Sequence, residues 1–299
     1  MGTMKHINSH VTRLARKAGP ILAAAATFVA AATASTPAAA QEIQLTGPLA
    51  GAPSVRKMRL YREGRFELAI GPGFTLLDEY QRTIFAAGRL QYNIFDWLGV
   101  GVFGGFGAVS LNTDLTDKIE STTLRNVSAT RKNLPQQRGA PNYDEQTGKL
   151  KFMFVPQVTF SPFRGKLAVF QKLFVDTDLY LHAGAAFVGL EERKDCGDAT
   201  KQQLSCTDPK SFVSDSRLQV APTFGLGLTL YTSGLVSVNI EYRAYPFSWN
   251  RGGFDSRGGG PDASFPDERL SSEDQTFKFN QMIFIAAGFY LPTSPKISE

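Results

Sequence analysis

The chain has 299 residues, enough for one large domain or two small ones, and 32 basic against 27 acidic residues give it a net charge of +5. Four of the basic residues lie in residues 1–40, which hold no acidic residue, so residues 41–299 carry 28 basic and 27 acidic residues. A remainder with a charge of only +1 gives no support to nucleic-acid binding. It also contains no run of ~18 apolar residues, which excludes a transmembrane helix there.

Residues 1–40 have the pattern of an export signal. A basic start is followed by an apolar, Ala-rich stretch over 21–34 and by small residues at 38–40. We therefore predict a signal peptide over 1–40, with a buried N-terminal helix or a membrane anchor as the alternative. Residues 41–63 are predicted to be an N-terminal periplasmic segment. This segment is interpreted as a solvated linker, and its basic stretch over 55–62 leaves a periplasmic partner open.

Apolar and polar residues alternate strictly in eight later segments, and such alternation predicts β-strands. The segments are 65–77, 83–95, 98–110, 149–161, 176–189, 217–231, 235–245 and 276–291. They are about twice as long as ordinary strands of ~5 to 6 residues, and crossing a bilayer takes ~9 to 11. In 217–231 one face carries Leu218, Val220 and Phe224, and the other carries Thr223 and Gly225. This pattern predicts an apolar face towards lipid and a polar or small face towards a narrow lumen.

The connections between these segments alternate between short and long. Short ones are expected at 96–97, 162–172 and 232–234, and long ones at 112–148, 190–216 and 248–275. Only the first connection on the long side, 78–83, is short. Short periplasmic turns opposite long external loops are typical of outer-membrane barrels. We predict an all-β fold: a closed antiparallel transmembrane β-barrel of about eight strands over 64–291, with a periplasmic tail over 292–299. The alternative is a soluble secreted barrel with its faces reversed.

Two kinds of residue stand out within or beside the strands. Pro72, Pro156 and Pro222 fall inside them, and because proline cannot donate to a ladder, each predicts a bulge or a rim position. Aromatic residues gather near strand ends and predict two interfacial girdles. The girdle residues are Tyr92, Phe95, Trp97, Phe289 and Tyr290 at one side, and Tyr245, Phe247 and Trp249 at the other.

The inward face carries the candidate functional residues, a lumen charge network of both signs. Its members are Arg65, Glu67, Arg89, Lys151, Asp176, Asp178, Arg217, Glu241, Arg243 and Lys278. Eight strands leave an interior that side chains can fill. The first interpretation is a structural ion-pair plug. The second is a narrow, weakly anion-preferring channel for ions or small solutes, in which Arg89, Arg243 and Glu241 move aside.

Catalysis, metal binding and cofactor binding find little support. His182 is the one His after residue 40, and Asp178 on the same strand face lies about 13 Å away, too far for a hydrogen bond. His182 is therefore interpreted as a packed lumen residue, and no cofactor is predicted. Cys196 and Cys206 predict a disulfide that closes a short loop, and such a loop stabilises by roughly 3 kcal/mol. Metal binding by the two cysteines is the alternative.

Three stretches resemble an outer-membrane β-barrel domain family found chiefly in myxobacteria and their relatives. They are LYREGRFELAIGPGFTL at 60–76, SPFRGKLAVFQKLFVDTDLYLHAGAAF at 161–187 and GFYLPTSPKIS at 288–298, and the likeness runs over most of 57–297. The resemblance implies an integral outer-membrane barrel and no particular activity. Gly288, Phe289 and Tyr290 also resemble the assembly signal that the outer-membrane insertion machinery reads, although a polar tail follows them.

The expected role is that of a non-enzymatic outer-membrane protein, structural or surface-interacting through its external loops. The alternatives are the narrow channel and, third, a barrel enzyme acting on lipid or peptide. The expected partners are outer-membrane lipid, the assembly machinery and an extracellular or periplasmic protein.

Overall fold

The structure is a computed structural model that describes residues 62–122, 143–169, 173–206, 208–256, 267 and 269–292. The predicted signal peptide over 1–40 and most of the predicted tail lie outside these described residues. No helix in the described part of the chain is both long and apolar enough to span a bilayer.

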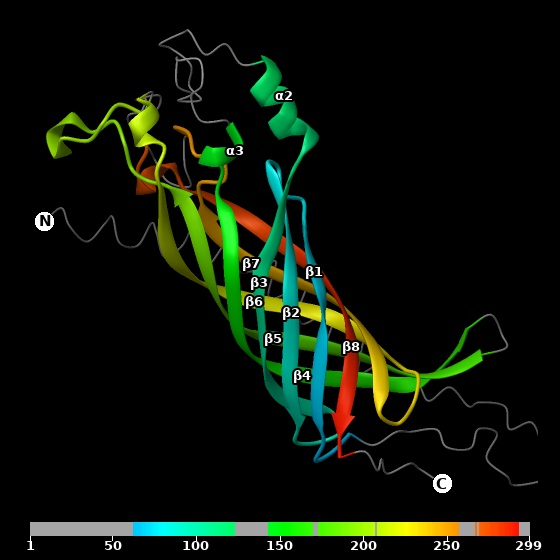
Figure 1. Ribbon diagram of the computed structural model, residues 1–299. Coiled ribbons are helices and arrows are strands. Elements are labelled where there is room, and N and C mark those ends of the chain that lie inside the picture. Colours follow the sequence, from blue (N-terminus) through cyan, green and yellow to red (C-terminus); the bar gives the residue numbers. More distant parts are fainter. Residues whose placement is uncertain are drawn as a thin grey trace, which may run out of the picture. The chain divides into compact units, whose positions relative to one another are not determined.

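Eight antiparallel strands close into one barrel in sequence order, and β1 completes it by pairing with both β2 and β8 (Figure 1). The strands are β1 (Phe66–Leu76), β2 (Gln81–Asn93), β3 (Leu98–Asn112), β4 (Lys149–Val169), β5 (Leu173–Arg193), β6 (Ser214–Tyr231), β7 (Val236–Trp249) and β8 (Thr276–Leu291). Closure leaves no free sheet edge where the strands pair. The predicted fold class, a closed all-β barrel of eight strands, is confirmed.

The two rims of the barrel differ. At one, the turn rim, residues 94–97 and 232–235 join β2 to β3 and β6 to β7. At the other, the loop rim, the long connections carry α2 (Asp114–Thr122), α3 (Tyr143–Gln146) and the 3-10 helices η1 (Ala199–Lys201), η2 (Pro209–Ser211) and η3 (Ser272–Asp274). Both helices lie beyond the same end of the barrel in Figure 1.

One connection differs from its prediction. Residues 162–172 were expected to be a turn, but β4 and β5 are 21 residues each and keep pairing out to Val169 opposite Leu173. The pair projects past the turn rim as a two-stranded hairpin, because β3 leaves β4 at Phe160 and β6 leaves β5 at Asp176 (Figure 1). A register shift between Phe160 and Phe163 marks where the hairpin begins.

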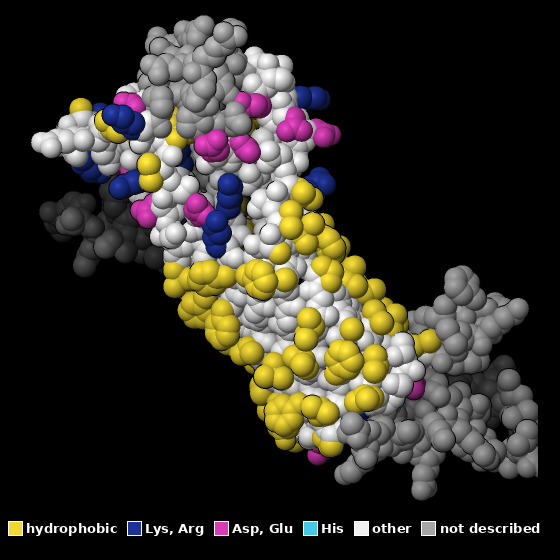
Figure 2. Space-filling view, viewed as in Figure 1, with side chains coloured by type: hydrophobic (Ala, Val, Ile, Leu, Met, Phe, Trp, Pro, Cys, Tyr) yellow, Lys and Arg dark blue, Asp and Glu magenta, His cyan; other side chains and the backbone are white. Residues whose placement is uncertain are grey.

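The outward face of the barrel is apolar, as the alternation predicted. Hydrophobic side chains cover the strands in Figure 2, and charged side chains gather at the loop rim. Large exposed apolar residues occur on all eight strands, among them Ile70, Leu90, Val100, Phe154, Leu181, Leu218, Ile240 and Phe289.

The inward face is not polar throughout. Its half nearer the loop rim is an apolar layer of buried side chains, which include Phe85, Met153, Val188, Leu190, Tyr245, Phe247, Trp249 and Phe284. The prediction that Tyr245, Phe247 and Trp249 form an outer girdle is therefore wrong. They alternate in step with Arg243 along β7, so they point into the barrel like that residue. The placement of Tyr290 in the other girdle is wrong too, since Tyr290 is buried beside Tyr231 and Arg65.

Each predicted proline irregularity coincides with a gap in one ladder. β1 and β8 are unpaired at Pro72, between Ile70 and Gly73, and β4 and β5 are unpaired at Pro156. Pro222 lies beyond the last pair of β6 with β7. In all three places pairing with the other neighbouring strand continues, because the missing N–H affects only one side of a strand.

Candidate functional site in the barrel interior

The half of the interior nearer the turn rim holds a network of buried ion pairs, which we call the charged layer. Arg89 donates from Nη2 to Glu67 Oε1 at 2.5 Å and from Nη1 to Glu241 Oε2 at 2.6 Å. Arg243 donates from Nη2 to the other oxygen of Glu241 at 2.5 Å and to Gln157 Oε1 at 2.7 Å. The four charged side chains are at most 1% exposed, and with Gln157 they link β1, β2, β4 and β7 across the lumen.

Glycines of β6 make room for the rings of this layer. A side chain at Gly227 would meet the ring of Tyr180, and one at Gly225 would meet His182. Tyr180 donates its hydroxyl to Glu241 at 3.0 Å, and its ring lies 4.8 Å from the Arg89 guanidinium. Gly225 and Gly227 are therefore places where the inward face leaves room for rings from β5.

His182 belongs to the same layer. Its Nε2 lies 3.3 Å from the carbonyl oxygen of Tyr242 and 3.5 Å from Glu241 Oε1. The residue is 3% exposed and lies between charged partners, so a substrate has no path to it in this arrangement. No group of His, Cys, Asp and Glu residues in the described ranges is arranged to hold a metal ion.

A second cluster closes the turn rim beneath the charged layer. Arg62 precedes β1, yet its Nε lies 3.2 Å from Asp178 Oδ2 and its Nη2 donates to Ser161 Oγ at 2.6 Å. Tyr231 donates its hydroxyl to Asp178 at 2.6 Å. Arg65 closes the same rim by donating to the carbonyl oxygens of Pro292 and Gly234. Sequence alternation did not identify Arg62, because the residue lies ahead of the first strand.

Asp96 holds the segment before β1 to the turn between β2 and β3. Partial burial alone would raise the pKa of Asp96. The backbone N–H groups of Arg62 and Glu63, which donate to Oδ1 at 2.7 and 3.1 Å, and the charge of Arg164 outweigh that effect. The pKa of Asp96 is therefore lowered from its ordinary value.

The ten residues predicted for the lumen network thus divide by height. Glu67, Arg89, Glu241 and Arg243 meet in the charged layer, and Arg65 and Asp178 lie in the cluster at the turn rim. The structure places the other four elsewhere. Arg217 pairs with Glu192 and Lys278 with Glu79 near the loop rim, and Asp176 lies at the base of the projecting hairpin, since an inward parity fixes a face of the sheet and not a height along the barrel. The prediction that Lys151 faces the lumen is wrong, because a register shift between Leu150 and Phe152 buries Leu150 inside and leaves Lys151 54% exposed beside Glu191.

The loops of the loop rim pack on one another. The predicted Cys196–Cys206 disulfide is present, and Cys196 exchanges two backbone hydrogen bonds with Leu270 of the β7–β8 connection. Arg193 at the end of β5 donates to the Cys206 carbonyl oxygen and stacks on Phe212. Burial lowers the pKa of Arg193 to about 10. These contacts fix the disulfide loop against the barrel.

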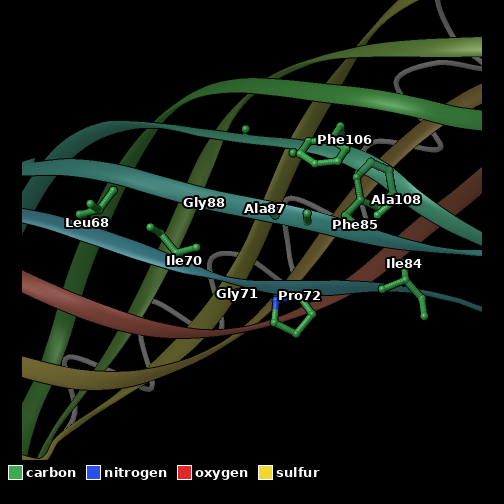
Figure 3. A pocket seen from close by; sticks show the side chains of 13 residues that line it. Leu68, Ile70, Gly71, Pro72, Ile84, Phe85, Ala87, Gly88, Phe106 and Ala108 are labelled. Carbon is green, nitrogen blue, oxygen red and sulfur yellow. The ribbon is translucent and has the colours of Figure 1, made fainter.

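A hollow on the outer face of the barrel is a weaker candidate. Small residues of β1, β2 and β3, among them Gly71, Gly88 and Ala108, leave a shallow space of about 860 Å³ beside Leu68, Ile70 and Phe106 (Figure 3). Its lining is apolar and faces the same way as the apolar outer surface, so acyl chains can fill it without a specific contact.

Comparisons with known proteins do not assign the chain to a family. No protein-family model matches the chain, and no curated protein matches it. Among solved structures the chain is similar to the N-terminal β-barrel domain of Pseudomonas aeruginosa OprF, with 10% identity over 77% of this chain and 98% of that one, at a TM-score of 0.39. It is also similar to the outer membrane protein OprG of Pseudomonas aeruginosa, with 10% identity over 77% and 97% of the two chains and a TM-score of 0.38. Neisserial surface protein A gives 11% identity over 76% and 93% and a TM-score of 0.34.

Proposed function

We propose that this chain is an integral outer-membrane β-barrel that is closed to passage, has no catalytic activity and anchors a surface-interacting group of loops. The apolar outer face supports a place in a bilayer. Leu218 and Val220 on β6, for example, are 58% and 54% exposed, and exposed apolar side chains of this number need a non-aqueous surrounding. The closed ladder satisfies most of the backbone groups that hydrocarbon could not.

The observation that carries the closed state is the charged layer. Arg89, Glu241 and Arg243 span the lumen, and each has an exposure of at most 1%. An ion or solute could pass only by breaking hydrogen-bonded ion pairs, and leaving such charges unpaired is costly. A structural plug is therefore favoured over the narrow channel.

The loop rim supports the surface-interacting role. The disulfide loop, the Leu270 bridge and the contacts of Arg193 give these loops a fixed arrangement. Charged side chains gather there, whereas the strands below are apolar (Figure 2). A fixed polar surface outside the bilayer suits recognition of an extracellular protein partner.

The proposed route to the membrane rests on sequence. An export signal over 1–40 would carry the chain across the inner membrane, and Gly288–Tyr290 at the end of β8 would be read by the assembly machinery. Both ends of the barrel, Phe66 and Leu291, lie opposite each other at the turn rim, which we place in the periplasm. The resemblance to the myxobacterial barrel family agrees with this placement.

The test is a conductance measurement on the refolded chain in a planar bilayer, after a gel has shown a heat-modifiable barrel. We expect a folded barrel without reproducible openings. Stable openings in the folded protein would overturn the closed state and make Arg89, Arg243 and Glu241 the first residues to substitute. Protease added to intact cells should cut between α2 and α3, and complete protection there would overturn the orientation.

A further inference from the structure

The ladder between β6 and β7 covers only half of the barrel wall. It runs from Tyr231 opposite Ser237 to Phe224 opposite Ala244 and stops there. Beyond that point residues 214–223 of β6 pair only with β5, and residues 245–249 of β7 pair only with β8. Two strand edges thus face each other without a ladder in the half of the wall nearer the loop rim. We call this region the β6–β7 seam.

Two prolines explain why the seam exists. If the register of Phe224 with Ala244 continued, Pro222 would lie opposite Pro246. Neither residue has an N–H group, so neither can donate to the other strand. Pro222 still pairs with Ala185 and Pro246 with Phe279 on their other sides, where pairing needs no N–H from either proline.

Side chains hold the seam together in place of a ladder. Thr223 donates its hydroxyl to the Ala244 carbonyl oxygen at 2.9 Å, and Arg217 donates from Nη2 to the Ser248 carbonyl oxygen at 3.2 Å. Glu192 accepts from the N–H group of Asn250 at 2.8 Å. These bonds can break one at a time, whereas a ladder opens cooperatively.

The seam lies at the height of the leaflet on the loop-rim side. Thr223 is eight residues from Tyr231, which is ~26 Å along a strand, or about 20 Å of height for a tilt of ~40°. This height lies past the middle of a hydrocarbon core ~30 Å thick. Outside the seam Val220, Phe224 and Phe279 are exposed, so lipid meets the wall where its ladder is missing.

Inside the barrel, where the β6–β7 ladder ends, lie three buried donors that have no hydrogen-bond partner among the described residues. They are the hydroxyl of Tyr245, Nη1 of Arg243 and Nε2 of Gln157. Arg243 and Tyr245 are alternate inward residues of β7, ~7 Å apart, and Gln157 contacts Arg243. Unpaired buried donors are costly, so their position at the border between the apolar and charged layers calls for an acceptor.

Charge and polarity indicate which acceptor fits. Arg243 is a cation, and the carboxylate that pairs with it, Glu241, is shared with Arg89. Towards the loop rim the interior beside the seam is largely apolar, with Phe247 and Trp249. It also holds Asn280, which donates to the Tyr245 carbonyl oxygen and accepts from Trp249 Nε1. A carboxylate on a long apolar chain matches both halves.

We propose that the β6–β7 seam is a lateral binding site for a long-chain carboxylate from the outer leaflet. Its carboxylate accepts hydrogen bonds from Tyr245, Arg243 and Gln157, and its chain lies beside Phe247 and Trp249 and leaves through the seam. The side chains there are packed, so entry requires the bonds of Thr223 and Arg217 to open. The charged layer beneath ends the site, which makes it a binding site and not a pore. The proposal rests on the membrane placement proposed above.

Trp249 provides a direct test, because it lies 3% exposed in the apolar layer and the chain has one other Trp, Trp97, at the turn rim. The full-length Trp97→Phe variant, refolded in vesicles, is titrated with dibromostearate, whose bromine atoms quench a tryptophan on contact. We expect saturable quenching of Trp249 and little quenching by the brominated methyl ester or by brominated phosphatidylcholine. Adding Tyr245→Phe should weaken the apparent affinity about tenfold, because one hydrogen bond to a charged group is lost.

Tyr245→Phe removes a hydroxyl that has no partner in the described part of the chain, so folding should survive. Thr223→Val, which removes one seam bond, should speed the quenching. Equal quenching by carboxylate, ester and phospholipid would mean that Trp249 meets bulk lipid, and this would overturn the site. Absence of quenching in a folded, non-conducting barrel would overturn the site and leave the proposed function intact. A conducting barrel would count against the closed state alone.

Discussion

Arg89 and Glu241 meet in the middle of the barrel, with Nη1 2.6 Å from Oε2, although 152 residues separate them in sequence. The other oxygen of the same carboxylate takes a hydrogen bond from Arg243 at 2.5 Å. One fully buried carboxylate therefore balances two guanidinium groups, each from a different strand. The interior of this barrel depends on that balance more than on any other single group.

Removal of the Glu241 carboxylate should destabilise the barrel strongly. Glu241→Ala leaves Arg89 and Arg243 buried with too little negative charge, and breaking one partner of a buried pair costs roughly 3–5 kcal/mol. The readout is the unfolding midpoint in urea, followed by the loss of the compact band on a gel. Lys151→Ala is the matched control, because its pair with Glu191 is exposed and is worth about 1 kcal/mol or less. Equal shifts in the two variants would contradict a buried network.

Asp96 should make the turn rim sensitive to acid. Its pKa in the folded chain is lowered, so it adds stability above its unfolded pKa of ~3.9 and loses that contribution as pH falls through the lower folded value. Asp96→Asn should therefore be less stable than the parent chain at pH 7, and the gap should narrow from about pH 5 downwards. Urea unfolding of both chains at several pH values measures this difference in stability. A gap that stays constant would show that Asp96 acts without its charge.

The disulfide should order the loops without holding the barrel. In Cys196→Ser/Cys206→Ser the short loop loses a cross-link worth roughly 3 kcal/mol, and the backbone bridge to Leu270 loses its support. We expect new protease cuts between β5 and β6, while the heat-modifiable band persists. Thiol labelling of the denatured, unreduced parent chain should fail. Labelling of both cysteines there would refute the bridge.

The two facing prolines should be the cause of the short β6–β7 ladder. In Pro222→Ala/Pro246→Ala both strands regain an N–H group, so pairing should extend beyond Phe224 and Ala244. Slow hydrogen exchange of the restored N–H groups at positions 222 and 246 would report the added pairs. Pro72→Ala is the control, since that proline interrupts the β1–β8 ladder instead. Fast exchange of both restored N–H groups would mean that strand twist, and not proline, separates the edges.

Much of the wall could be predicted from the sequence, because a two-residue period carries over directly into two faces of a strand. The alternation over 217–231 placed Leu218 outside and Thr223 inside, as the structure has them. The disulfide also followed from the spacing of Cys196 and Cys206. These are local properties of the chain, and each is fixed by residues that are near one another in sequence.

Height along the barrel could not be predicted, because it depends on the stagger between strands. Lys278 and Arg243 both have inward parity, yet one pairs with Glu79 near the loop rim and the other is buried in the charged layer. The apolar layer was missed for the same reason. Lys151 was placed on the wrong face because the register shift between Leu150 and Phe152 cannot be read from the alternation. To predict that Pro222 lies opposite Pro246, one would likewise need the register of β6 with β7. To predict the contact of Arg62 with Asp178, one would need the path of a segment that shows no alternation.

The projecting hairpin of β4 and β5 extends the barrel well beyond its turn rim. Val169 lies nine residues beyond Phe160, where β3 ends its pairing, so the tip extends ~30 Å along the strand, about the thickness of a bilayer's hydrocarbon core. Because this extension is a continuation of two wall strands and not a tether, a load applied at its tip is transmitted straight into the barrel wall. In the placement proposed here, a force applied in the periplasm about one hydrocarbon-core thickness away from the barrel would therefore act directly on its wall.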